Sequence, residues 1–242
     1  MSLALSSTVR DSPPSDSCAL PLPRLSGAGV YLLDLGRAPR ATTLLPRLTD
    51  AERARAARLA PALAERFAAR RWGLRLAAGA EMGLPPEAVP LWWDERGRPR
   101  LGSGGWSVSA SSAGGIGVAA VATRPVGVDI AAAGLAGVAR QATAGLPLGQ
   151  DAAAGTAETG RAGSRQSLRV WMQLEAVLKA AGLDLATPWA ARCVRAERWR
   201  PDSACVLRFD PPGPAGRRWR AVDLPMPPGF AAILVTAADI GQ

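Results

Sequence analysis

Residues 171–182 read Trp-Met-Gln-Leu-Glu-Ala-Val-Leu-Lys-Ala-Ala-Gly. Most of these residue types favour an α-helix, and Gly182 is suited to end it in the left-handed conformation that other residues avoid. Glu175 and Lys179 lie four positions apart, so their side chains share one face of the helix and can reach each other. This spacing is common on helices, and an ordinary surface ion pair is the simplest interpretation.

Lys179 is the only lysine in a chain that is rich in arginine. The sequence uses arginine everywhere else that positive charge is needed. Position 179 therefore requires a compact ammonium rather than a planar guanidinium. This preference indicates a functional site on the helix.

Length and composition describe a globular protein with a positive charge. At 242 residues the chain can form one large domain or two half-size lobes around a buried core. Its hydrophobic content is 48% and its charged content 20%. The net charge of +9 favours acidic partners, which are nucleic acid, phosphate-bearing ligands or an acidic protein. No apolar run reaches the length of a membrane span, so no membrane partner is expected.

The sequence contains no histidine. This excludes Ser-His and Cys-His nucleophile systems, His-ligated zinc sites and histidine acid–base catalysis. Proton transfer must therefore fall to Asp, Glu, Lys, Tyr, Cys or water. The three cysteines are too few and too scattered for a disulfide framework or a cysteine-based zinc site, which favours a reducing, cytoplasmic location.

The N-terminal half of the sequence alternates strand and helix signals. Its first residues are rich in Ser and Pro and predict a disordered leader. Thr49 or Asp50 can cap a helix that runs to residue 59, and a second helix is predicted over 61–83. The predicted strands are 29–35, 91–94 with a return segment at 95–101, 106–111, 117–122 and 126–130.

The C-terminal half repeats this plan. Residues 131–166 hold few large apolar side chains and predict a short helix and a mobile loop. After the 171–182 helix, strands are predicted at 193–200, 204–210, 218–224 and 230–236. The fold class is therefore α+β, with two similar lobes packed together: a leader at 1–26, an N-terminal lobe at 27–125 and a C-terminal lobe at 126–242. Asp129 can meet Glu175 near the join, although helix or turn capping is the simpler role for Asp129.

Several segments together resemble the Sfp-type 4′-phosphopantetheinyl transferases. Each family motif is short, but the order and spacing of the motifs are specific. Gly-Val-Asp-Ile-Ala at 127–131 resembles the family's G-V/I-D-I-E strand, and 171–179 resembles its W-x-x-K-E-A/S-x-x-K helix. Ser-Val-Ser-Ala-Ser at 107–111 resembles an N-L-S-H-S strand, and Gly-Arg-Pro at 97–99 a G-K/R-P turn. The resemblance covers roughly residues 29–237.

The resemblance implies a pseudo-dimer of two α+β lobes and a magnesium-dependent transfer of 4′-phosphopantetheine. Coenzyme A is the substrate, the acceptor is a serine of an acidic acyl or peptidyl carrier protein, and 3′,5′-ADP leaves. Asp129 and Glu175 match the metal ligands, Glu175 would also take the serine proton, and Lys179 would stabilise the transferred phosphoryl group. The positions matched with coenzyme A binding are Arg66, Arg75, Arg98, Ser109 and Ser111. A monomer suffices for this plan.

Three positions depart from the family pattern. Ala110 replaces a histidine matched with the 3′-phosphate, Ala131 replaces a third carboxylate, and Leu174 replaces a lysine that lies against the pyrophosphate. Losing one charge-assisted phosphate contact costs on the order of 1.5–3 kcal/mol, which handicaps an enzyme without abolishing activity. The middle region also lacks the helix that docks the carrier in the family.

Two other functions remain open from the sequence. The first is a degenerate family member that binds a carrier or a nucleotide without transfer, for which the three replacements argue. The second is a basic nucleic-acid-binding protein, which the positive charge and eight tryptophans permit. The arginines are spread along the chain and no nucleic-acid motif is found, so the transferase is the favoured prediction.

Overall fold

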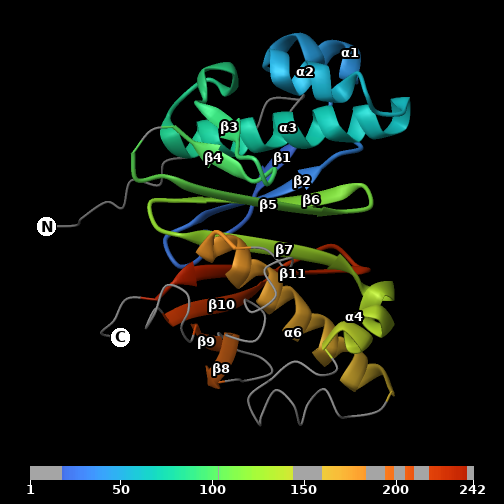
Figure 1. The fold of residues 1–242 in the computed structure, drawn as a ribbon. Coiled ribbons are helices and arrows are strands. Elements are labelled where there is room, and N and C mark those ends of the chain that lie inside the picture. The colour runs from blue at the N-terminus through green and yellow to red at the C-terminus, as the bar shows by residue number, and fades with distance from the viewer. Residues whose placement is uncertain are drawn as a thin grey trace, which may run out of the picture.

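The fold is α+β, with two antiparallel sheets packed face to face and a long helix on each outer side (Figure 1). The computed structural model describes residues 18–102, 104–143, 160–183, 194–198, 205–209 and 218–238. From one outer side to the other, the layers are helix α3, the first sheet, the second sheet and helix α6.

The first sheet and its helices come from the N-terminal half. The strand order is β1-β2-β6-β5, and all pairs are antiparallel. A separate hairpin, β3 with β4, lies beside it. The elements are β1 (Ala19–Pro21), β2 (Gly29–Asp34), α1 (Ala41–Leu44), η1 (Leu45–Arg47), α2 (Asp50–Ala56), α3 (Pro61–Met82), η2 (Pro86–Ala88), β3 (Leu91–Trp93), β4 (Pro99–Leu101), β5 (Ser107–Ala113) and β6 (Ile116–Ala122).

The second sheet belongs to the C-terminal half, in the order β7-β11-β10-β9-β8, again antiparallel throughout. Its first strand, β7, follows the first sheet directly in the chain. The elements are β7 (Val126–Ala132), η3 (Ala133–Leu135), α4 (Ala136–Thr143), α6 (Gly160–Ala181), β8 (Val194–Arg198), β9 (Cys205–Phe209), β10 (Arg218–Leu224) and β11 (Phe230–Ala237).

Local signals in the sequence set the helix ends. Thr49 caps α2 in a capping box with Glu52, in which each side chain bonds the other residue's backbone N–H. Pro61 begins α3 at the position where its missing N–H costs nothing. At the end of α6, Gly182 adopts a φ of 74°, and the next N–H donates to the Leu178 carbonyl over 2.8 Å.

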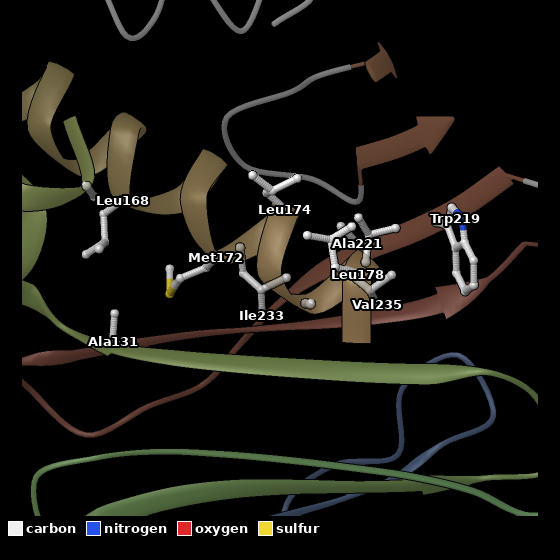
Figure 2. Packing of buried hydrophobic residues seen from close by; sticks show 12 residues of the cluster. Ala131, Leu168, Met172, Leu174, Leu178, Trp219, Ala221, Ile233 and Val235 are labelled. Atoms are coloured by element: carbon white, nitrogen blue, oxygen red, sulfur yellow. The ribbon is translucent and has the colours of Figure 1, made fainter. Parts of the chain in front are cut away.

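Helix α6 buries its apolar face on the second sheet (Figure 2). Met172 and Leu178 lie close to Ile233 and Val235 of β11, and Leu174 belongs to the same buried cluster. This burial removes large aliphatic side chains from water and stabilises the fold by about 25 cal/mol for each Å² of apolar surface buried. The packing fixes how α6 lies across the sheet and therefore where its other face points.

The strand β7 has a different role on each face. Val126, Val128 and Ile130 pack into the core between the two sheets. The alternate residues point the other way, because successive side chains of a strand face opposite sides. On that side Ala131 joins the core between the second sheet and α6. Asp129, two residues before Ala131 in the strand, faces α6.

The predicted α+β class is confirmed, and most predicted elements are present with shifted ends. Helix α6 begins at Gly160, eleven residues before the predicted helix, so its first turns occupy part of the predicted loop. Within that loop, η3 and α4 also form, whereas residues 144–159 lie outside the described residues. The predicted leader is wrong at its end, since Ala19–Pro21 pairs with β2; residues 1–17 lie outside the described residues.

No helix in the described segments combines the length and the hydrophobicity that a membrane crossing needs.

Candidate functional site

A close approach of two backbones brings α6 and β7 together. At Gly127 of β7, an added Cβ would lie 1.9 Å from the Ala176 carbonyl oxygen and 2.8 Å from the Ala180 nitrogen. Only glycine can occupy this position without displacing the helix. The residues beside these contacts, Glu175 and Lys179 on the helix and Asp129 on the strand, are thereby brought face to face.

Lys179 is the centre of the resulting cluster. Its Nζ lies 2.6 Å from Oδ1 of Asp129, 3.2 Å from Oγ of Ser111 and 3.3 Å from the Val128 carbonyl oxygen. Ser111 in turn donates its hydroxyl proton to the same Asp129 oxygen over 2.8 Å. Asp129 is only 3% exposed, so the ammonium and the hydroxyl supply the polar contacts that a buried carboxylate needs.

Glu175 completes the cluster from the same helix face. Its Oε2 lies 3.8 Å from Nζ of Lys179. Burial raises the pKa of Glu175 to about 7, and the negative charge of Asp129 and a hydrogen bond with Asp129 add to this, while Lys179 and Trp171 act in the opposite direction. The negative charges of Asp129 and Glu175 therefore disfavour each other, and positive charge next to them relieves this.

A row of serines on β5 joins the two sheets beside this cluster. Strands β5 and β7 are edge strands of different sheets. The hydroxyl oxygens of Ser107 and Ser109 accept the backbone N–H groups of Val126 and Val128, over 3.2 and 3.1 Å. Ser111, the next in the row, bonds Asp129 instead. The row therefore holds the join together at one end and takes part in the cluster at the other.

A cavity of about 260 Å³ opens on one side of the cluster. We call it the Arg98 cavity. Arg98 is held there by Asp94, whose Oδ2 accepts from Nε over 2.9 Å, and by a hydrogen bond to the Gly182 carbonyl. The cavity therefore brings cationic and aromatic groups next to Lys179. Its lining includes Trp92, Arg98, Arg100, Trp106, Ser109 and Lys179.

A second cavity, of about 240 Å³, lies further along β5 and is here called the Arg71 cavity. Arg71 lines it with two buried nitrogens, Nε and Nη1, that have no hydrogen-bond partner among the described residues. Burial lowers the pKa of Arg71 to about 9, so the guanidinium stays charged at neutral pH. The other lining residues are Leu33, Arg70, Leu74, Trp93, Ala110, Ser111 and Ser112.

The structure brings together most of the residues predicted for the site. Asp129, Glu175, Lys179 and Ser111 form one cluster, so the capping role considered for Asp129 does not apply. The pair of Glu175 and Lys179 is also partly buried rather than a surface ion pair. Arg98 and Ser109 line the adjoining cavity.

Two predicted coenzyme A contacts lie elsewhere. Arg66 is exposed on α3 and lines neither cavity. Arg75 is 3% exposed and binds Glu52 over 2.8 Å and the Val89 carbonyl over 3.2 Å. Its guanidinium is held inside the N-terminal half and lines neither cavity, although its Nε has no hydrogen-bond partner among the described residues, so these contacts give Arg75 a structural role.

Arg70 and Arg71 are the site residues that sequence reasoning missed. Four arginines lie on α3, and their spacing does not show which of them face the ligand side. The Arg-Arg-Trp run at 70–72 gave no clear signal, because the side chains of adjacent helical residues point about 100° apart. Only the packing of α3 against the first sheet shows that Arg71 reaches a cavity.

The carboxyl oxygens of the cluster are of the kind that a divalent cation binds. Magnesium prefers oxygen ligands and is often held by one or two carboxylates together with phosphate oxygens and water. Asp129 and Glu175 supply two converging carboxyl groups, and a cation would replace the proton that the raised pKa of Glu175 retains. Among the described residues, no group of three or more His, Cys, Asp or Glu side chains forms a metal cluster, so water and ligand oxygens would complete the shell.

The chain matches no protein-family model, and none of the curated proteins compared with it is similar.

Proposed function

We propose that this protein transfers the 4′-phosphopantetheine group of coenzyme A to a serine of an acyl or peptidyl carrier protein, and that the reaction depends on magnesium. One observation carries the proposal: Asp129, Glu175 and Lys179, from two elements far apart in the chain, converge on one cluster between two cationic cavities. Such an arrangement suits a diphosphate, since carboxylates can hold a cation and arginines can bind phosphate oxygens. The resemblance noted in the sequence supports the same reaction and a pseudo-dimeric family fold.

The metal would be held by Asp129 and Glu175. When bound, magnesium supplies positive charge next to the diphosphate. Lys179 contributes a further, fixed ammonium, which Asp129, Ser111 and the Val128 carbonyl hold in place. A compact point charge held in this way is suited to stabilise the negative charge of the transferred phosphoryl group.

Each of the two cavities would bind a different part of coenzyme A. The Arg98 cavity adjoins Lys179 and offers Trp92 and Trp106 as surfaces for the adenine, with Arg98 beside the diphosphate. The Arg71 cavity, with Arg70, Arg71 and Ser112, would take the 3′-phosphate. Arg71 would then supply the positive charge that Ala110 lacks at the position of the family histidine.

In the transfer step, the serine hydroxyl of the carrier attacks the β-phosphorus of coenzyme A. A new bond forms between the serine oxygen and phosphorus, the bond from phosphorus to the bridging oxygen breaks, and 3′,5′-ADP leaves. Glu175 takes the serine proton, directly or through a water, since its carboxylate is the base nearest to Lys179 that Asp129 leaves free. Lys179 stabilises the negative charge on the transferred group.

The carrier partner would be acidic, in keeping with the net charge of +9. We also propose a cytoplasmic location, where coenzyme A and carrier proteins meet, and a protein that acts as a monomer.

A catalytically degenerate member is the second candidate, and two buried residues favour it. Leu174 and Ala131, which stand where the family has a lysine and a third carboxylate, are 4% and 6% exposed within the core beneath α6. Neither can contribute charge to the site. Such a protein would bind coenzyme A or a carrier without transferring anything.

Mass spectrometry of a carrier protein distinguishes the two candidates. The protein is incubated with coenzyme A, magnesium and several apo carrier proteins, and the expected result is a phosphopantetheine adduct on the carrier serine. A parallel reaction with chelator should give no adduct, and one with the Lys179→Met variant should form adduct much more slowly. If no carrier is modified at high protein concentration while coenzyme A still binds, the degenerate function replaces the transferase.

A further inference from the structure

The Arg71 guanidinium lies against two aromatic rings. Its central carbon lies 3.0 Å from the centre of the Trp93 ring and 4.6 Å from the centre of the Phe67 ring. An arginine in contact with aromatic faces is held by cation–π attraction and loses little of its hydrogen-bonding capacity, because the rings cover the faces of the planar group and leave its edge free.

Trp93 is itself held in place by a buried network. Its indole N–H donates to Oε1 of Glu52 over 3.1 Å. The other oxygen of Glu52 accepts from Arg75 over 2.8 Å and from the backbone and side chain of Thr49 over 3.0 Å. Glu52 and Arg75 are both 3% exposed, so this ion pair is a fixed part of the interior.

These contacts form a chain that crosses three elements. It runs from Arg75 on α3 to Glu52 on α2, to Trp93 at the end of β3, and back to Arg71 on α3. At its end are the two nitrogens of Arg71 that have no partner among the described residues. Unpaired buried donors are costly unless a ligand binds them, so the chain maintains a guanidinium that is ready for an anion.

We propose that Trp93 is a positioning residue for phosphate recognition: it fixes Arg71 so that the free edge of the guanidinium binds the phosphate that enters the Arg71 cavity. The inference rests on the proposed function for the identity of that phosphate, which is the 3′-phosphate of coenzyme A. It assigns to Trp93 an effect on one part of the ligand only, since Trp93 lines the Arg71 cavity and not the Arg98 cavity.

The test compares two ligands that differ by that single phosphate. Calorimetry with the full chain and magnesium measures the dissociation constants of coenzyme A and of dephospho-coenzyme A, and the ratio of the two reports the contribution of the 3′-phosphate. In the unaltered protein the ratio should favour coenzyme A by about ten- to a hundredfold, as for a charge-assisted contact. Arg71→Gln sets the baseline in which the contact is lost.

Trp93→Leu should weaken coenzyme A binding by about three- to thirtyfold and leave dephospho-coenzyme A binding unchanged, which brings the ratio close to that of Arg71→Gln. Trp93→Phe keeps the ring but loses the bond to Glu52, so its ratio should lie in between. Trp92→Leu, next to it on β3 but in the Arg98 cavity, should weaken both ligands alike. Thermal unfolding checks that each variant is folded.

A ratio in Trp93→Leu equal to that of the unaltered protein overturns the proposal. If Trp93→Leu does not fold, Trp93→Met, which fills the space without a ring face, decides on the same criterion. Failure of the proposed function looks different, because an unaltered protein that binds neither ligand does not use coenzyme A. An unaltered protein that binds both ligands equally instead overturns the 3′-phosphate contact at Arg71, and the assignment of Trp93 falls with it.

Discussion

Nζ of Lys179 lies 2.6 Å from Oδ1 of Asp129, which links the last turns of α6 to the middle of β7. The same nitrogen is in reach of Ser111 on β5 and of a β7 carbonyl, so three elements meet at one ammonium. A tetrahedral ammonium can donate to three acceptors from a single point, whereas a guanidinium spreads its donors over a plane. This geometry gives a physical reason for the single lysine of an arginine-rich chain.

Replacing Lys179 by arginine should therefore not preserve function. We expect Lys179→Arg and Lys179→Met both to lower kcat/KM for carrier modification by more than about tenfold, because one displaces and the other removes the positive charge that stabilises the transferred group. The larger guanidinium cannot enter the position between Asp129 and Ser111 without displacing one of them. Steady-state rates of adduct formation, with melting curves as a check of folding, measure the effect. Normal rates in Lys179→Arg would show that any positive charge suffices at this position.

Replacing Asp129 or Glu175 should change the dependence of the transfer rate on magnesium, whereas replacing other acidic residues should not. Asp129→Asn and Glu175→Gln are expected to abolish magnesium-stimulated transfer, because each removes one of two candidate metal ligands. Asp223→Asn is the matched control, since Asp223 is half exposed in an ion pair with Arg169 on another part of the surface. Magnesium titrations of the transfer rate compare the three variants. A similar loss in all three would mean that net charge, rather than a metal site, is being measured.

The sequence predicted the cluster better than it predicted the cavities. Glu175 and Lys179 had to share a helical face, and Asp129 lay near the end of an apolar strand, so two of the three elements were in place from periodicity alone. The approach of helix and strand was not predictable in this way. It depends on Gly127 and on the packing of α6, which only the folded chain shows.

Arg75 shows why the ligand-binding arginines could not be chosen from spacing. Arg71 and Arg75 are four residues apart on α3 and share a face, yet one lines a cavity and the other is enclosed by Glu52. What separates them is the position of α2, whose capping box directs Glu52 inward. A contact between segments more than twenty residues apart leaves no periodic signal in the sequence.

Stability of the metal-free protein should depend on pH through Glu175. The pKa of Glu175 is raised from 4.5 to about 7 in the folded state, because burial and the nearby Asp129 disfavour its charge. Its contribution to stability is therefore fully present below about pH 4.5 and is lost as the pH rises through about 7. Glu175→Gln removes this penalty, so the variant should gain melting temperature over the unaltered protein at pH 8 and little at pH 5.

Magnesium should reverse this difference. At pH 8 we expect added magnesium to raise the melting temperature of the unaltered protein and to leave Glu175→Gln unchanged, since a bound cation offsets the repulsion between the two carboxylates. At pH 5 the proton already occupies the site and the ion should have a smaller effect. Scanning fluorimetry at the two pH values, with and without chelator, measures all four cases. A magnesium effect that is equal at both pH values would contradict the shared site.

Arg75 should be important for stability rather than through contact with the ligand. Burial favours the neutral form of Glu52, but hydrogen bonds from Arg75 and Thr49 outweigh it and keep the pKa of Glu52 below its usual value. Arg75→Met would leave this carboxylate buried without its partner, at a cost of about 3–5 kcal/mol in the free energy of unfolding. Arg47→Met, whose pair with Glu87 is half exposed, should cost less than about 1 kcal/mol. Urea unfolding compares the two, and a fully stable Arg75→Met that has lost coenzyme A binding would restore the direct ligand role.

Gly127→Ala tests the contact on which the whole cluster depends. The added Cβ would lie 1.9 Å from the Ala176 carbonyl oxygen, which belongs to helix backbone and cannot rotate away. Helix α6 must therefore move from β7, and Glu175 and Lys179 move with it. We expect a loss of about 1–3 kcal/mol in the free energy of unfolding, as for other overpacked sites, together with a more than tenfold lower transfer rate measured where the variant is still folded.

The control for this change is Gly137→Ala on α4, where no atom lies within 4 Å of the added Cβ. Because alanine favours a helix over glycine by roughly 0.5–1 kcal/mol, this variant should be slightly more stable and fully active. The comparison separates the loss of glycine itself from the collision with α6. If Gly127→Ala kept both the stability and the rate of the unaltered protein, α6 would not lie against β7 as closely as the cluster requires, and Asp129 could not share a cation with Glu175.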